Sequence, residues 1–269
     1  MSVCELDQRV PQRGIVPFLR VCYQSYRNWQ KRRGRERKHK RRLQAMLDFY
    51  GALIKEGDIC FDIGANMGSR TEAFLALGAR VIAVEPQENC ALILREKFGA
   101  NTNFILVNKA LDKIEGEREF FVSNAHTLCS MSREWIRNAK DHNFFEGCSW
   151  DGKRLVRTTT LDALVESYGL PAFCKIDVEG FEFEVLQGLS QPIRTISLEY
   201  TFGFIEPIIN SIKYLAPLGD VEFNYSEGES LSFALPKWVS AREIVDALSH
   251  LSGKVPFGDL YARFAGNRS

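Results

Sequence analysis

Two segments of the 269-residue chain contain residue types at a spacing that could support chemistry. In the first, residues 60–69, a short apolar run ends at Asp62 and leads into a turn of small residues. In the second, residues 174–180, an apolar run ends in three ionisable residues: Lys175, Asp177 and Glu179. Because a lone charge is costly to bury, this grouping favours a polar cleft over a core. A salt-bridged helix N-terminus, which the helix dipole stabilises, is the alternative.

The turn after Ile63 differs from a phosphate-binding loop. Counting from Gly64, the second and third glycine positions of Gly-x-Gly-x-x-Gly hold Asn66 and Ser69, so the NAD fingerprint of an oxidoreductase is absent. Glycines without a Cβ let the backbone approach a ligand, and backbone N–H groups suit a carboxylate. An acidic side chain suits an ammonium group, and S-adenosylmethionine carries both groups. The residues predicted to hold its methionine part are Asp62, Gly64, Ala65, Asn66 and Gly68.

The next two expected strands supply residues for an adenosine. The strand over residues 80–84 leads to Glu85, whose carboxylate can accept both ribose hydroxyls, and Pro86 ends that strand. The strand over residues 103–107 is expected to end near the adenine edge, where the candidates are Asn108, Ala110 and Leu111. The alternatives are a capped strand end with an incidental acid and a plain exit from strand to loop.

A second group of candidates lies where a substrate would be activated. Alternation along an extended strand is expected to place the ionisable residues of segment 174–180 on one side. The fifth core strand ends in another acid at the same edge of the sheet. Such carboxylates could remove a proton from a hydroxyl or hold Mg²⁺ as a Lewis acid, and the sequence does not choose. The candidate catalytic residues are Asp177, Glu179, Glu199 and His126, the last with a polar loop residue as the alternative.

Alternating strand-like and helical runs position these residues. The expected core strands are 58–63, 80–84, 103–107, 172–176 and 195–198, and the helices between them are 69–77, 89–98 and 182–189. This alternation indicates α/β architecture with a parallel sheet of right-handed βαβ units. Further strands are expected at 117–122 and 155–160, with a loop or cap between them. The end of the chain predicts antiparallel strands at 221–225, 231–235 and 259–264 around a helix at 241–251.

The charge is distributed unevenly along the chain. The formal net charge is +1, yet residues 1–42 carry 13 Lys and Arg against three acids, and the remainder is net acidic. With 45% hydrophobic and 26% charged residues, the composition excludes disordered, collagen-like and coiled-coil classes. Seven cysteines without a Cys-x-x-Cys pair predict reduced thiols and no cysteine metal site. We therefore predict a basic helical extension over residues 1–50, followed by a single domain over residues 51–269.

Several segments together are similar to a known family. They are FDIGANMGSRTEAF, VIAVEPQ, NKALDK, RTTTLDAL, KIDVEGFEFEVLQGL and GDLYARF, within residues 59–264. In this order they resemble the FkbM family of S-adenosylmethionine-dependent methyltransferases. The resemblance implies a Rossmann-like class I fold, with a seven-stranded, mostly parallel sheet and an antiparallel C-terminal strand. It also implies O-methylation of a hydroxyl, commonly on a sugar or glycosylated natural product.

The resemblance carries roles to particular positions. It implies that Asp62, Gly64, Asn66 and Gly68 bind the methionine part of the cofactor, Glu85 the ribose, and Asp177 and Glu179 the acceptor edge. The loop 123–131 departs from the glycine- and serine-rich sequence of many relatives, because it holds His126 and Cys129.

The basic extension has several interpretations. With residues 18–42 it could form an amphipathic anchor at an anionic membrane surface, which would suit a lipid-linked acceptor. Direction to RNA is an alternative, although few aromatics interrupt the basic run. A solvated helix capping the domain is the third. Since no secretory signal and no long apolar run are found, we expect a cytoplasmic protein, peripheral at the inner membrane surface. The sequence predicts no oligomeric state.

Overall fold

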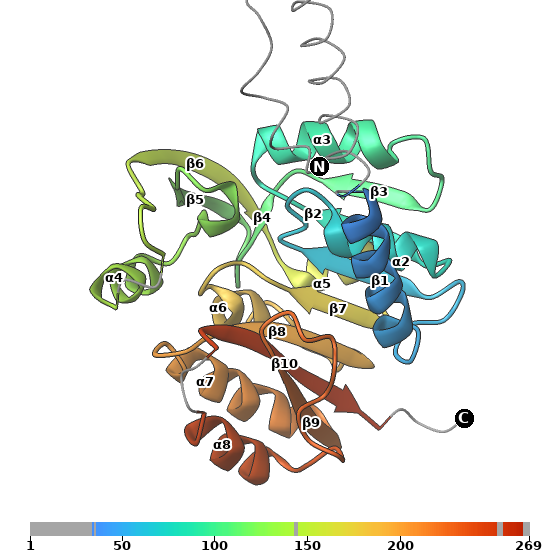
Figure 1. Ribbon diagram of the computed structural model, residues 1–269, viewed down its shortest axis with the longest axis vertical. Helices are drawn as coiled ribbons and strands as arrows, with labels where there is room; N and C mark the ends of the chain where they lie inside the picture. The colour runs from blue at the N-terminus through green and yellow to red at the C-terminus, as the bar shows by residue number, and fades with distance from the viewer. Residues whose placement is uncertain (1–33, 35, 143–144, 252–254, 266–269) are drawn as a thin grey trace, which may run out of the picture. The chain divides into compact units, whose positions relative to one another are not determined.

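The computed structural model describes residues 34, 36–142, 145–251 and 255–265 (Figure 1). The chain divides into two compact units, Met1–Ala45 and Met46–Ser269. Residues 36–45 of the first unit are helical, and residues 46–50 of the second unit are helical as well. Most of the predicted basic extension, including residues 18–33, lies outside the described residues. Within the described ranges, no helix combines the length and the apolar character needed to cross a bilayer.

A seven-stranded sheet forms the centre of the second unit. Its order is β3 (Phe104–Val107), β2 (Arg80–Val84), β1 (Ile59–Ile63), β7 (Phe173–Ile176), β8 (Thr195–Thr201), β10 (Phe257–Phe264) and β9 (Val221–Glu227). The pairs from β3 through β8 are all parallel, whereas β10 is antiparallel to both of its neighbours. The predicted mostly parallel sheet with an antiparallel C-terminal strand is therefore confirmed.

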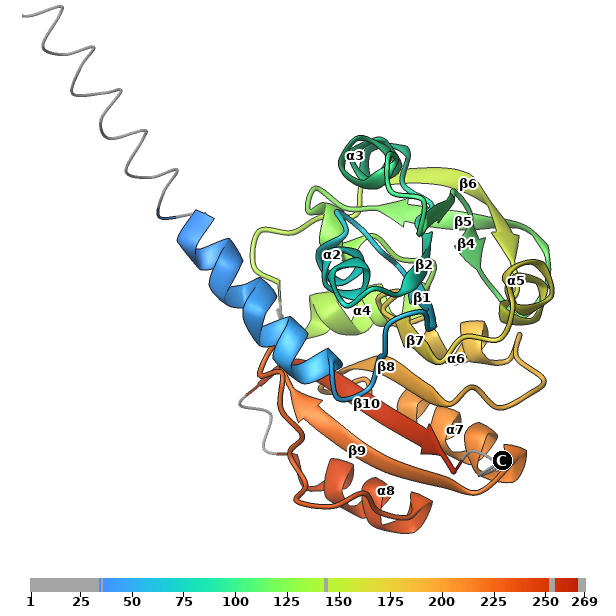
Figure 2. The ribbon, with the colours of Figure 1, turned by 90° about the vertical axis from the view of Figure 1, so that its right-hand side faces the viewer.

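Helices cover both faces of this sheet, as Figure 2 shows. On one face, apolar side chains of the central strands form the main core with the helices α5 (Leu161–Tyr168), α6 (Glu182–Leu186), α7 (Glu206–Leu215) and α8 (Ala241–Ser249). On the other face lie α2 (Ser69–Ala76) and α3 (Glu88–Phe98), where Phe74 contacts Tyr50 and Phe173 edge to face. Strand side chains alternate between the faces, so each strand contributes to both layers.

A smaller sheet is inserted between β3 and β7. It contains β4 (Ala110–Leu111), β6 (Gly152–Thr159) and β5 (Gly116–Val122) in that order. Between β5 and β6 run a short 3-10 helix, η2 (His126–Leu128), and α4 (Arg133–Asp141). The two strands expected here are confirmed, and the stretch expected as a loop or cap contains α4. The hydroxyl of Ser132 caps this helix by accepting from the Trp135 backbone N–H.

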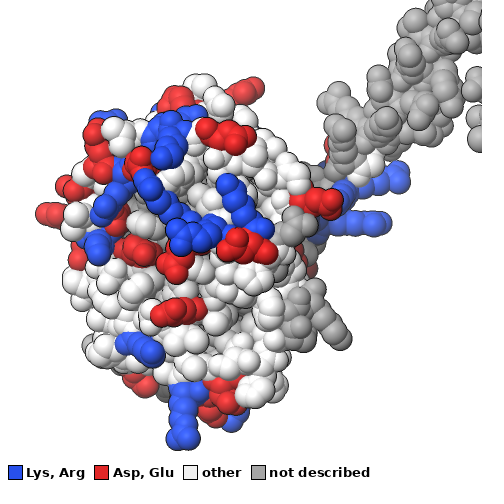
Figure 3. All heavy atoms as spheres, turned by 90° about the vertical axis from the view of Figure 1, so that its left-hand side faces the viewer, with Lys and Arg blue, Asp and Glu red and all other residues white. Residues whose placement is uncertain are grey.

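The outer surface of this insertion carries many Lys and Arg side chains, which gather in the upper part of Figure 3. Strands β5 and β6 alone expose Arg118, Lys153, Arg154 and Arg157. Acidic residues lie among them, and Glu119 pairs with both Arg133 and Lys153. The surface is therefore one of mixed, ion-paired charge.

Residues 231–235 form no strand, so the prediction of a strand there is wrong. Leu231 has a φ of 50°, a left-handed conformation that interrupts an extended chain. The side chain of Asn224 then takes the place of a strand partner for the backbone of Leu235. Its Nδ2 donates to the Leu235 carbonyl over 3.0 Å, and its Oδ1 accepts from the Leu235 N–H over 3.1 Å. This residue-specific pairing has no signature in an alternating apolar pattern.

Candidate active site

A cavity of about 510 Å³ opens at the carboxyl ends of the central strands. The sheet contributes the ends of β1, β2, β7 and β8 to its lining, and the insertion contributes apolar side chains that include Phe120, Leu128 and Met131. The volume is in the range typical of small-molecule sites. Carboxyl ends of parallel strands are also where open α/β sheets bind ligands.

The turn between β1 and α2 requires glycine for two different reasons. Gly64 has a φ of 81°, and a Cβ there would lie 1.8 Å from the Asp177 carbonyl oxygen. Gly68 has a φ of 82°, and its Cβ would meet the Phe98 ring at 2.5 Å. Gly64 and Asn66 line the cavity, whereas Ala65 packs against Leu94 of α3. Gly68 thus permits close packing with α3, and a contact of Gly68 with cofactor stays a prediction.

Asp62 is buried beneath this turn. Its side chain accepts a hydrogen bond from the Thr71 hydroxyl, which joins the end of β1 to α2. Burial raises the pKa of the Asp62 carboxyl. Asp62 is not among the residues that line the cavity, so its contact with a cofactor ammonium group stays a prediction.

Glu85 lies at the end of β2 and lines the cavity. Its Oε2 accepts from the Asn66 N–H and its Oε1 from the Gln87 N–H, each over 2.8 Å. Burial nevertheless raises the pKa of Glu85 to about 7. The Asn108 amide donates to the Glu85 carbonyl over 2.8 Å and so supports the strand end.

Of the other residues predicted to bind the adenosine, some line the cavity and one does not. Pro86, Ala110 and Leu111 line the cavity. Asn108 does not line it, since its amide is directed to Glu85. The roles of these residues toward a ribose and an adenine stay predictions.

Lowering the pH from 8 to 6 is expected to weaken the binding of S-adenosylhomocysteine about tenfold, as calorimetry would show. This follows from the predicted ribose role of Glu85, in which ribose hydroxyls would donate to its carboxylate and protonation near pH 7 would remove that acceptor. Asp62 is the charged neighbour that raises the pKa of Glu85 further. In Glu85→Gln the affinity should be lower and flat over this range. If the pH dependence persists in that variant, another group carries it.

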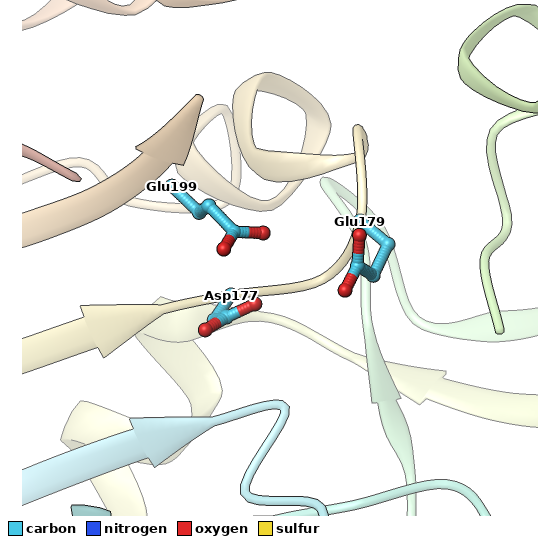
Figure 4. Close-up of side chains that lie close together, drawn as sticks. All are labelled: Asp177, Glu179 and Glu199. Carbon is cyan, nitrogen blue, oxygen red and sulfur yellow. The ribbon is translucent and has the colours of Figure 1, made fainter. Parts of the chain in front are cut away.

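Three carboxyl groups meet at the cavity wall, as Figure 4 shows. Asp177 follows β7, Glu179 lies in the next turn, and Glu199 belongs to β8. Each offers an oxygen within 4.8 Å of the other two. The three groups converge as expected. Alternation along an extended strand was predicted to bring Asp177 and Glu179 to one side, and that reason is wrong because β7 ends at Ile176, before both residues.

Glu179 reaches the cluster through a left-handed residue conformation. Its φ is 56°, which is unfavourable for a residue with a long side chain. The insertion supports this turn, since the Ser130 hydroxyl donates to the Glu179 carbonyl over 2.6 Å. The ring of Trp135 lies against Gly180, where a Cβ would approach it to 2.3 Å. The cap between β5 and β6 therefore shapes the acidic turn.

The three carboxyl groups differ in their affinity for protons. Burial would raise the pKa of Asp177, but the charges of Lys175 and Arg70 overcome it and lower the pKa. For Glu179 and Glu199, burial and the neighbouring Asp177 charge raise the pKa well above its usual range. Asp177 is consequently the most acidic of the three, and the two glutamates take up a proton more readily than it does.

Lys175 does not face the cleft as the sequence suggested. It is fully buried, with its Nζ 2.7 Å from Asp259 Oδ1 of β10 and 3.3 Å from Asp177 Oδ2. The competing interpretation, a charged helix N-terminus, also holds in part. Glu182 Oε1 accepts from the N–H groups of Val178 and Gly180, over 3.0 and 3.2 Å.

His126 begins η2 and lines the cavity. Its backbone carbonyl accepts from Gln87 Nε2 over 2.9 Å and from Asn66 Nδ2 over 3.3 Å.

Sequence reasoning missed Gln87, although its place directly after Pro86 was a usable signal. It also missed Glu229, a cavity residue that pairs with Arg70 over 3.0 Å. Glu229 follows β9, far along the chain, and nothing local marks it.

The strand order, the antiparallel β10 between β8 and β9, and a cavity at the strand ends define a class I methyltransferase fold. Residues 62–222 match the family model described as the methyltransferase FkbM domain. The chain belongs to this family, as the resemblance predicted.

Individual relatives are more distant. The hexuronic acid methyltransferase AglP of Haloferax volcanii is 27% identical over 146 residues, 53% of this chain and 54% of that protein. This chain thus spans about half the length of the curated relative it matches. The O-methyltransferase of Bacillus cereus, solved with S-adenosylhomocysteine, is 14% identical, with 97% of this chain and 87% of that one covered and a TM-score of 0.41. The precorrin-6Y C5,15-methyltransferase of Geobacter metallireducens is 12% identical, with 83% and 87% covered and a TM-score of 0.43.

Proposed function

We propose that the chain is an S-adenosylmethionine-dependent O-methyltransferase whose acceptor is a hydroxyl of a sugar, a glycan, or a glycosylated or lipid-linked metabolite. Membership of the FkbM family supports methyl transfer, and the hexuronic acid methyltransferase relative supports a sugar. The observation that carries the proposal is the convergence of Asp177, Glu179 and Glu199 in the cavity that Gly64 and Glu85 also line.

The residues of the cavity suit the parts of this cofactor. Glu85 offers a carboxylate for ribose hydroxyls, and the turn from Gly64 to Asn66 exposes backbone to the cavity. Leu111 and Phe120 offer apolar surface for a flat base. When bound, S-adenosylmethionine supplies a methyl group activated by its sulfonium. The chain's contribution is to align the acceptor oxygen with that methyl group, and alignment of this kind lowers a barrier strongly.

The carboxyl cluster is proposed to handle the acceptor proton. Ionised Asp177 accepts a hydrogen bond from the acceptor hydroxyl and so orients its lone pair. As the oxygen reacts, its proton passes to the cluster. Three carboxylate oxygens at this spacing are also ligands that Mg²⁺ prefers, which gives a second means of activating the hydroxyl. Turnover that needs added Mg²⁺ and stops with EDTA would favour the cation.

The acceptor can be found by incubating the protein with methyl-labelled S-adenosylmethionine and fractionated cell extract, next to a panel of neutral and acidic sugars. We expect label in a methyl ether of a sugar-containing product. Label found only in RNA or protein would contradict the proposal.

With that acceptor, Asp177→Asn should lower turnover about 100-fold or more, since a positioned acid or base contributes at least that much. Binding of S-adenosylhomocysteine should stay within about threefold, because Asp177 acts on the acceptor. The matched control is Glu117→Gln on the exposed part of β5, which should leave both quantities unchanged. Full turnover in both Asp177→Asn and Glu179→Gln would remove the cluster from the mechanism.

A further inference from the structure

One backbone carbonyl at the cavity connects the turns that follow β1 and β2. The His126 carbonyl accepts from two side-chain amides, that of Asn66 in the turn after β1 and that of Gln87 after β2. The segment 125–129, which contains His126, lines the cavity along its whole length. The two loops that are expected to bind the cofactor thus hold segment 125–129 at the cavity through hydrogen bonds.

The same two residues hold the Glu85 carboxylate. The backbone N–H of Asn66 donates to one of its oxygens and that of Gln87 to the other, each over 2.8 Å. Each residue therefore contacts Glu85 through its backbone and the His126 carbonyl through its side chain, and the Gln87 side chain also lowers the pKa of Glu85 by hydrogen bonding to it. Glu85 and segment 125–129 are thus linked through one residue on either side, Asn66 and Gln87.

The remaining hydrogen bonds of this segment stay inside the insertion. Among the described residues, Ala125 N–H donates to the Ser123 hydroxyl over 3.1 Å, and the Trp150 indole N–H donates to the Leu128 carbonyl over 2.6 Å. Removing the amide contacts would therefore free the segment from β1 and β2 while leaving its own fold in place.

We propose that Asn66 and Gln87 form an amide clasp that positions segment 125–129 over the bound cofactor and slows its exchange. Gln87 is then a positioning residue, acting through the His126 carbonyl rather than on reacting atoms. This inference rests on the proposed function, because it takes the cavity to hold S-adenosylmethionine.

The test uses the full chain and S-adenosylhomocysteine in stopped-flow dissociation, with tryptophan fluorescence as the signal because Trp150 contacts the segment. Loss of one such hydrogen bond is worth about 1 kcal/mol, so Gln87→Ala should speed dissociation about fivefold. Asn66→Gly removes the other amide but tolerates the φ of 49°, and should act similarly. Leu92→Ala, at an exposed site on α3, is the control and should change nothing.

Hydrogen exchange of the free protein gives a readout that needs no ligand. Amides of residues 126–129 should exchange about fivefold faster in Gln87→Ala than in the wild type, with equal thermal stability. Unchanged exchange in both clasp variants, or unchanged dissociation, would overturn the clasp. If the wild type does not bind S-adenosylhomocysteine, the proposed function fails, and the exchange measurement still decides whether the amides hold the segment.

Discussion

Replacing Gly64 by alanine is expected to destabilise the protein by about 4 kcal/mol or more and to abolish binding of S-adenosylhomocysteine. The new Cβ would lie 1.8 Å from the Asp177 carbonyl oxygen and 2.9 Å from its carbon. These are backbone atoms, and the Asp177 N–H is itself bonded to the Ile63 carbonyl over 3.0 Å. Relief would therefore require β1 and β7 to separate where the cavity is formed.

Gly57→Ala is the matched control for this effect. Gly57 has a φ of 84°, close to the 81° of Gly64, but no atom lies within 4 Å of its Cβ position. The free energy of unfolding of this variant should fall by only about 1 to 2 kcal/mol, the cost of an alanine in the left-handed conformation. Denaturant unfolding measures both variants. Equal losses would show that backbone conformation alone, and not the contact with Asp177, demands glycine at position 64.

Replacing Lys175 by methionine is the second change with a large expected effect, about 3 to 5 kcal/mol of unfolding free energy. The Lys175 side chain is 1% exposed and pairs with Asp177 and Asp259. Methionine has similar length but no charge, so two carboxylates at the centre of the sheet would lose their counter-ion. Thermal and denaturant unfolding provide the measurement.

Two further variants separate charge from packing at this position. Lys153→Met removes a lysine whose side chain is 57% exposed and 3.7 Å from Glu119, so it should cost less than about 1 kcal/mol. Adding Asp259→Asn to Lys175→Met should recover part of the loss, because it removes one unpaired charge. Without any recovery, the loss would come from packing rather than from the buried ion pair.

The fold was largely predictable because its signals are local. Apolar runs separated by helical periods mark four of the parallel strands within one residue, and β8 runs three residues beyond its expected end. The regions that were missed depend on particular distant partners. The backbone of Leu235 is satisfied by the Asn224 side chain instead of a strand, and α4 is held by Trp135, whose indole donates to Thr201 over 2.9 Å.

The candidate site likewise has features that could be predicted from local sequence and features that depend on tertiary contacts. The amino-acid sequence was enough to place the acids Asp62, Glu85, Asp177 and Glu199 within or directly after the strands, and to place glycines at the first turn. Local residue types give these features, although β8 runs to Thr201, beyond the strand end expected at Glu199. Only the tertiary structure decided which of these groups face the cavity and which partners set their charge. Lys175 meets Asp259 across 84 residues, and His126 meets Gln87 across 39. Such pairs arise when strands and loops are brought together by folding, and no local periodicity encodes them.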